Sequence, residues 1–419
     1  MHDIADSIPA ATPYSEIFMK NKPCILHVKE IRLCCGCLMI LKRFGNVSKS
    51  KMTLRKNFNV YNMCIFLLWF TFPNHSAATT KCQNLNGNAP AQPRGMTLIA
   101  GGAAVNWVAN PVDVTQRDAH SFGKVLEHVI AENAENKFIA YNNIPPDVPK
   151  VNTKSNSKGL LMMNPQPADA ASWIVHTVPG FPKALRGYLF PPEEIQKGHL
   201  FICLTIKESE IDAIAMALRI ATPLIYHNDI PDTEINSRPN LKKLVNGESR
   251  LTPPLTVTRQ ISTAAAPGLK VTIYSKGEKS KYEIYRRVLV KKLKTGIKVW
   301  TTRDKILKSD CRILNRNIKL VTSPITVGDH ASSLESDVSQ WLISDPGNKF
   351  CAVDKPYHKS QTKEPAIAVC IDDATIFGHF NLIGQNFIFL NLATCRDFLP
   401  AEFFHFLPAP LLYSGSRAL

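Results

Sequence analysis

Two short apolar runs joined by a turn-forming segment constrain the fold more than any other part of the sequence. The runs are residues 160–163 and 173–175, and the segment between them is rich in Pro, Asn and Ala. Short apolar runs bounded by turn signals are typical of buried strands, so we expect a β-hairpin. Lys158 precedes the first run and His176 follows the second. A strand end holds a side chain firmly and leaves its tip in solvent, which suits a catalytic group. A core hairpin with a surface lysine and a hydrogen-bonded histidine fits the same pattern.

The residues around this hairpin also form a signature. Lys158-Gly159 opens it, and the second run continues as Trp-Ile-Val-His-Thr-Val-Pro-Gly-Phe-Pro over residues 173–182. This pattern resembles the core signature of the deoxyribonuclease II family, acid endonucleases of the phospholipase D superfamily. The resemblance implies an α+β, phospholipase D-like fold with two similar halves, each a mixed β-sheet flanked by helices, and a site at their junction. It also implies hydrolysis of DNA phosphodiesters without a metal or any other cofactor.

The sequence departs from the family at its catalytic positions. The family uses two His-x-Lys pairs, in which one His attacks phosphorus, the other moves protons, and the lysines neutralise phosphate oxygens. In the first pair Asn156 replaces the His and Lys158 keeps the Lys. In the second pair Val338 replaces the His and Gln340 the Lys, within the frame of residues 337–341. Only Lys158 keeps the role that the resemblance assigns.

Two function hypotheses follow. We expect a deoxyribonuclease II family protein with impaired catalysis, because neither an amide nor an alkyl side chain can act as nucleophile or acid. Its residual activity would use His176, which the family pattern places in the supporting framework, or the shifted Asp329-His330. The alternative is a secreted pseudoenzyme that binds nucleic acid or a protein partner without cleaving it.

The charge of the chain permits DNA or another polyanion as a partner. The formal net charge is +16, and attraction to phosphates is the sequence-independent part of nucleic-acid binding, although solubility accounts for such a charge nearly as well. A helix ending at Gly296 is predicted to carry Arg287, Lys291 and Lys294 on its basic face. These residues are candidates for phosphate contacts, and a solvated helix face is the plainer interpretation. The apolar face of this helix is predicted to consist of Tyr282, Tyr285, Leu289 and Leu293.

The N-terminal region predicts export. Residues 52–78 contain a basic start, an apolar run and small residues in the order of a signal peptide, which implies a secreted or lysosomal protein. The run at residues 64–72 is too short to span a bilayer; its rival interpretations are a buried strand or an uncleaved anchor. Residues 1–51 are then an upstream extension of unknown role. The predicted organisation continues with a first half at 82–245, a second half at 246–395 and a C-terminal tail at 396–419.

The cysteines fit an exported chain. The Cys residues after the signal peptide are Cys82, Cys203, Cys311, Cys351, Cys370 and Cys395. An even number of widely spaced Cys in such a chain predicts three disulfides, for which about fifteen pairings exist. None has zinc-site spacing, so we expect no metal. The family resemblance implies the pairs Cys82–Cys203, Cys351–Cys370 and Cys311–Cys395.

Apolar periodicity predicts the remaining elements. Helices are expected at 120–136 and 210–220, and the polar stretch 229–250 is expected to separate the two halves. Strands are expected at 137–141, 198–206, 255–258, 269–276 and 297–301.

Overall fold

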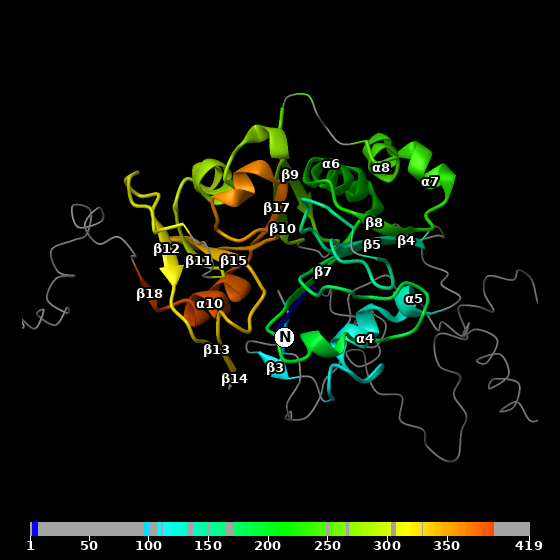
Figure 1. The fold of residues 1–419 in the computed structure, drawn as a ribbon, viewed down its shortest axis with the longest axis horizontal. Coiled ribbons are helices and arrows are strands. Elements are labelled where there is room, and N and C mark those ends of the chain that lie inside the picture. Colours follow the sequence, from blue (N-terminus) through cyan, green and yellow to red (C-terminus); the bar gives the residue numbers. More distant parts are fainter. Residues whose placement is uncertain are drawn as a thin grey trace, which may run out of the picture. The chain divides into compact units, whose positions relative to one another are not determined.

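The computed structural model describes residues 2–6, 96–99, 107–109, 112–131, 137–149, 151–164, 171–248, 252, 254–264, 268–302, 307–328 and 330–388. Within these residues the chain is a mixed α+β protein with two eight-stranded β-sheets and a two-stranded ribbon (Figure 1). The predicted signal peptide lies outside them. No helix in the described part is long and apolar enough to cross a bilayer.

The first sheet contains the predicted hairpin at its centre. Its strands, in spatial order, are β3 (Val108–Ala109), β2 (Met96–Ile99), β1 (His2–Asp6), β7 (Leu200–Ile206), β6 (Ala171–His176), β5 (Gly159–Met163), β4 (Lys137–Tyr141) and β8 (Ile225–Asn228). β5 and β6 are antiparallel, with Leu161 opposite Trp173, which confirms the hairpin. β1 pairs in parallel with β2 and β7, although the sequence of residues 1–51 shows no folding pattern.

The second sheet follows in the chain. Its strands, in spatial order, are β18 (Phe387–Ile388), β12 (Ile318–Val321), β11 (Gly296–Trp300), β15 (Trp341–Asp345), β16 (Lys349–Val353), β17 (Ala366–Asp372), β10 (Lys270–Lys276) and β9 (Thr256–Ser262). β11 and β12 are parallel, and the other neighbouring pairs are antiparallel. β13 (Ile325–Val327) and β14 (His330–Ser332) form the separate ribbon.

Helices and the opposite sheet bury both faces of each sheet. One apolar cluster joins Trp173 of β6, Ile214 of α6 (Ile211–Ala221) and Val369 of β17, so the two sheets share a core. α4 (Ser121–Val125) and α5 (Glu127–Ile130) pack on the other face of the first sheet. The π-helical turn η4 (Ile284–Leu289) packs on the other face of the second sheet. Burial on both faces explains why the strands are continuous apolar runs rather than alternating ones.

The remaining helices are short. They are α7 (Asp232–Ser237), α8 (Pro239–Val245), α9 (Val290–Leu293), α10 (Ala374–Ile383) and the 3-10 turns η1 (Pro192–Glu194), η2 (Glu208–Glu210), η3 (Glu278–Ser280) and η5 (Ser360–Lys363). The polar stretch 229–250, expected as a boundary, contains α7 and α8. Leu241 of α8 is fully buried, and its N–H, like that of Asn240, donates to Asp212 Oδ1 of α6. This stretch is therefore packed structure rather than a plain linker.

Two helix predictions were wrong in detail. The helix expected at 120–136 is broken into α4 and α5 at Leu126, which leaves the helical conformation. The basic helix ends at Lys294, whose φ of 58° is left-handed, rather than at Gly296. Gly296 is instead the first residue of β11, where a Cβ atom would lie 2.7 Å from the Asp345 carbonyl oxygen. Tyr282, expected on the apolar face, is 46% exposed.

One predicted disulfide is confirmed in full. Cys351 and Cys370 are cross-strand neighbours on β16 and β17, and their sulfur atoms are bonded. Cys203 and Cys311 are also disulfide-bonded. Their expected partners, Cys82 and Cys395, lie outside the described residues.

Candidate functional site

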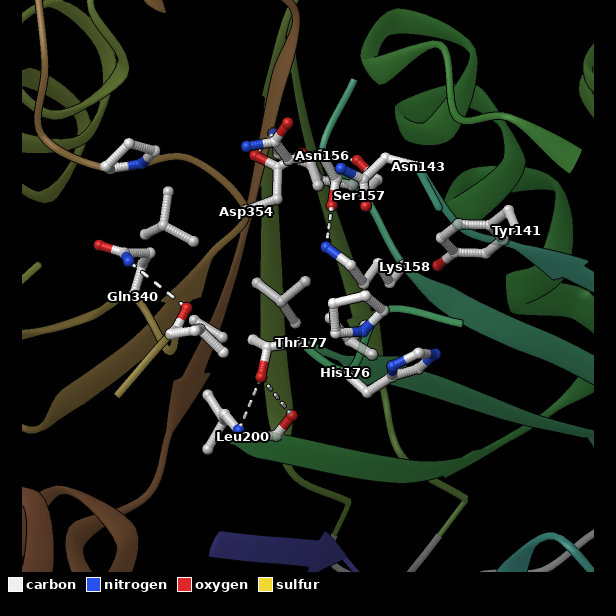
Figure 2. A pocket seen from close by; sticks show the side chains of 18 of the residues that line it. Tyr141, Asn143, Asn156, Ser157, Lys158, His176, Thr177, Leu200, Gln340 and Asp354 are labelled. Carbon is white, nitrogen blue, oxygen red and sulfur yellow. Dashed lines mark hydrogen bonds between the residues drawn. The ribbon is translucent and has the colours of Figure 1, made fainter. Parts of the chain in front are cut away.

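A cleft with a volume of about 230 Å³ is lined by residues of both sheets (Figure 2). Asn156 and Lys158 reach it from the segment before β5, and Val338 and Gln340 reach it from the segment before β15. These are the four positions that the sequence resemblance assigns to the two His-x-Lys pairs. His176 lines the same cleft. The fold thus brings together motif positions about 180 residues apart in the sequence.

Lys158 is half-buried in this cleft. Its ammonium group donates a hydrogen bond of 3.3 Å to the Asn156 carbonyl oxygen. Burial lowers the pKa of Lys158 to about 8, while the nearby Asp354 carboxylate opposes the shift. The lysine is therefore positively charged at neutral and acid pH. Among the described residues lining the cleft, no other side chain is a lysine or an arginine.

Asp354 couples the two sheets beside this lysine. Its Oδ2 atom accepts a hydrogen bond of 2.6 Å from the Ser157 hydroxyl, and Oδ1 accepts one of 2.9 Å from the Ile367 N–H. Burial raises the pKa of Asp354, and Lys355 and these hydrogen bonds oppose the increase. Asp354 was not predicted as a site residue. The sequence feature that could have identified Asp354 is its position shortly after Phe350-Cys351, a segment that resembles the family.

His176 is held as a neutral hydrogen-bond acceptor. Its Nδ1 atom accepts a hydrogen bond of 3.2 Å from the Val178 N–H, so the neutral ring carries its proton on Nε2. Nε2 is buried without a hydrogen-bond partner in the described part of the chain. Burial, followed by the charge of Lys158, lowers the pKa of His176 well below its ordinary value. Neither ring nitrogen offers a free lone pair to a substrate, which opposes its use as a nucleophile.

Backbone hydrogen bonds connect the second motif, residues 337–341, to the segment before β7 of the first sheet. Gly198 forms a parallel bridge with Asp337; its N–H donates to the Ser336 carbonyl at 2.7 Å, and its carbonyl accepts from the Val338 N–H at 3.0 Å. The buried Asp337 carboxylate accepts hydrogen bonds from Ser339 and Ser332. These contacts fix the segment that carries Val338 and Gln340 into the cleft.

The chemistry of these two positions is limited. Val338 has only an alkyl side chain. Gln340 is buried, its Oε1 atom accepts from the Thr302 N–H at 3.3 Å, and its Nε2 group lies 3.4 Å from the Val338 carbonyl oxygen. The second half-site therefore provides neither a titratable group nor a charge.

Thr177 lines the cleft next to His176. Its Oγ1 atom accepts a hydrogen bond of 2.9 Å from the Leu200 N–H and lies 3.2 Å from Nδ1 of the buried His199. Nε2 of His199 is 3.1 Å from Glu194 Oε2. Sequence analysis missed this group, because no motif links residues 177, 194 and 199.

The other predicted site residues are not in the cleft. His330 begins β14 and is absent from the cleft lining, while Asp329 lies outside the described residues. Arg287, Lys291 and Lys294 are exposed on η4, on α9 and at its end. In the described part of the chain, no three His, Cys, Asp or Glu side chains are grouped so that they could hold a metal ion.

Comparison with known proteins gives the same assignment as the motifs. The sequence model of Deoxyribonuclease II matches residues 102–388. The chain is 23% identical to Plancitoxin-1 of Acanthaster planci over 63% of this chain and 74% of that protein. It is 23% identical to Deoxyribonuclease-2-alpha of Rattus norvegicus over 59% and 72%, and 25% identical to Deoxyribonuclease-2-beta of Homo sapiens over 54% and 62%. The chain is thus a divergent member of the deoxyribonuclease II family.

Proposed function

We propose that the cleft between the two sheets binds the phosphodiester backbone of DNA, and that hydrolysis of the deoxyribonuclease II type is severely impaired there. The observation that carries this proposal is the replacement of three of the four motif positions within one cleft. Asn156, Val338 and Gln340 surround it, and Lys158 alone keeps its family identity.

The impairment follows from the chemistry of the replacements. Asn156 cannot form a phosphohistidine, and Val338 cannot protonate the leaving oxygen. Loss of a general acid or base costs about 10²- to 10⁴-fold in rate, and losses within one catalytic unit do not add independently. His176 does not compensate, because the Val178 N–H occupies its Nδ1 lone pair.

DNA is the proposed ligand on two grounds. The relatives named above are deoxyribonucleases in two of three cases, and Lys158 remains charged at the pH where acid nucleases work. We propose Arg287, Lys291 and Lys294 as a second, peripheral phosphate contact, since all three are exposed. The net charge of +16 favours association with a polyanion.

The finer organisation is part of the proposal. The two sheets would be related halves of a phospholipase D-like protein, 82–245 and 246–395, with a tail at 396–419. Residues 52–78 would be a signal peptide; its cleavage would also separate β1 (His2–Asp6), which pairs with β2 and β7, from the rest of the first sheet. We propose a secreted or lysosomal destination. The disulfide between Cys351 and Cys370 and the bonded states of Cys203 and Cys311 support an oxidising compartment.

A nicking assay combined with a binding titration tests this function. Supercoiled plasmid is incubated with the full chain at acid pH in the presence of a chelator, and binding of a labelled duplex is measured against salt. We expect little nicking and an affinity that falls steeply as salt rises. Nicking that His176→Ala or His330→Ala abolishes would show an active enzyme instead. A flat salt response would favour a protein partner.

A further inference from the structure

A buried polar chain leads from the cleft into the first half of the molecule. It begins at the half-buried hydroxyl of Thr177, which Figure 2 shows beside the Leu200 backbone. It continues through His199, which is fully buried, to Glu194, which is 4% exposed. The proposed binding role of Lys158 uses none of these groups. Their order, with a hydroxyl, an imidazole and a carboxylate in contact, makes the proton position on each atom decisive.

With His199 neutral, Thr177 offers the cleft no proton. Glu194 Oε2 lies 3.1 Å from His199 Nε2, so a carboxylate there favours the tautomer with its proton on Nε2. Nδ1 is then an acceptor, and the Thr177 hydroxyl, 3.2 Å away, donates to it. One lone pair of Oγ1 accepts from the Leu200 N–H at 2.9 Å. Thr177 lines the cleft, and an anionic phosphate oxygen that approached Oγ1 from there would meet the other lone pair and be repelled.

When His199 is protonated, the Thr177 hydroxyl no longer donates a hydrogen bond to Nδ1 but accepts one from it. Both ring nitrogens now donate, so Nδ1–H fills one lone pair of Thr177 Oγ1 and the Leu200 N–H fills the other. The hydroxyl proton is released from the imidazole. Its competing acceptor, the Leu200 carbonyl oxygen, is 3.5 Å away, at the limit of a hydrogen bond. A phosphate oxygen in the cleft is a stronger acceptor for this proton.

The groups around His199 set where it titrates. Burial lowers its pKa most, while Glu194 and Asp337 raise it, so that its pKa lies below the ordinary value. Burial raises the pKa of Glu194, but its contacts with His199 and Lys197 lower that pKa by more, so Glu194 remains anionic. The nearby His176 is neutral. Protonation of His199 therefore belongs to the acid range.

We propose that the Thr177 hydroxyl is a phosphate-oxygen donor in the cleft and that protonation of His199 turns this donor on. This inference rests on the proposed DNA-binding function and makes it specific for acid conditions. The ligand class is a phosphodiester, whose oxygen atoms accept hydrogen bonds and cannot donate them. The same hydroxyl disfavours such a ligand when His199 is neutral.

Binding of a rhodamine-labelled DNA duplex at about pH 5 and about pH 7, where Lys158 is largely charged at both pH values, tests the proposal at constant ionic strength. We expect the wild-type chain to bind about tenfold more tightly at the lower pH through this donor. In His199→Gln the amide can donate to Glu194 and accept from Thr177, which mimics neutral His199. This variant should match wild type at about pH 7 and lose the acid gain. Thr177→Val should also lose the gain, and Thr177→Ser should keep it.

Control measurements distinguish this switch, in which protonation of His199 frees the Thr177 hydroxyl proton, from other effects of low pH on DNA binding. His379→Gln on α10, outside the cleft lining, should keep the acid gain. Thermal melting curves establish that each variant is folded. Imidazole NMR of the wild-type chain provides a second measurement, because phosphate binding must raise the pKa of His199 if the two events are linked.

The outcomes distinguish the two proposals. A wild-type chain that fails to bind DNA at either pH overturns the proposed function and the switch with it. A chain that binds DNA, while His199→Gln and Thr177→Val retain the full acid gain, overturns the switch alone. A His199 pKa that does not change when DNA binds also overturns the switch alone.

Discussion

Ser157 donates a hydrogen bond of 2.6 Å to Asp354, a residue 197 positions later in the chain. The bond joins the segment before β5 to the end of β16, directly beside Lys158. Lys355, the neighbour of Asp354, crosses in the same place: its ammonium group donates to the Lys154 carbonyl oxygen at 2.5 Å and to Glu364. The second sheet thus contributes to the surroundings of Lys158, whose pKa is lowered most by burial and, to a smaller extent, raised by Asp354 and lowered by Lys355.

Restoring the missing groups should restore hydrolysis. The triple variant Asn156→His, Val338→His, Gln340→Lys places both pairs around the existing cleft. We expect metal-independent plasmid nicking at acid pH, at least about 10²-fold above wild type. The three single variants should remain near wild type, because the groups act as one unit. Adding Lys158→Met to the triple variant is the control and should remove the gain. A triple variant that is folded and inactive would contradict the assignment of these positions.

Lys158 should supply the cleft's positive charge to DNA. In Lys158→Gln we expect about tenfold weaker binding and a salt slope smaller by about 1, because one phosphate contact is lost. Because the pKa of Lys158 is about 8, wild-type affinity should also fall as the pH rises through that value, and the variant should lack this decrease. Lys359→Gln, an exposed lysine outside the cleft, is the matched control. Equal salt slopes for the two variants would exclude the cleft as the contact.

The Gly198→Ala substitution should destabilise the packing of the second motif, residues 337–341, against Gly198. A Cβ atom there would lie 2.7 Å from the Asp337 carboxylate and 2.9 Å from the Ser332 hydroxyl. We expect a loss of about 1–3 kcal/mol in the free energy of unfolding, measured by urea denaturation. Gly378→Ala on α10 is the matched control, because its Cβ would meet nothing within 4 Å. That change should stabilise the chain by up to about 1 kcal/mol through helix propensity. Equal effects of the two substitutions would refute the close approach.

Glu283 should make stability depend on pH. Burial is the main reason that its pKa is raised from 4.5 to about 7, although the Tyr285 and Arg286 N–H groups bond to it. The folded state holds this proton more tightly than the unfolded state. The contribution is therefore complete below about pH 4.5 and is lost as the pH rises through about 7.

The expected size of that contribution is about 3 kcal/mol. Urea denaturation across this pH range should show a decrease for wild type that is absent in Glu283→Gln. Glu193→Gln, at an exposed position, should keep the wild-type decrease. A wild-type curve that rises with pH in the same range, relative to Glu283→Gln, would contradict the direction of the shift.

Much of the secondary structure was predictable from local pattern. The strand expected at 137–141 is β4, and the apolar runs at 160–163 and 173–175 lie within β5 and β6. These strands can be recognised in the sequence because strands buried on both faces must be apolar throughout. The breaks at Leu126 and Lys294 were not predictable in this way. They depend on how each helix meets the sheet that it covers.

The sequence by itself determined the family and the identities at the four motif positions, because covalent chemistry belongs to each residue alone. Only the tertiary structure decided that Asn156, Lys158, Val338 and Gln340 share one cleft. It also decided that His176 is neutral and that Thr177 meets His199. The reason is physical. Desolvation and electrostatic interactions depend on which residues pack next to one another in space, and this cannot be read from their separation along the chain.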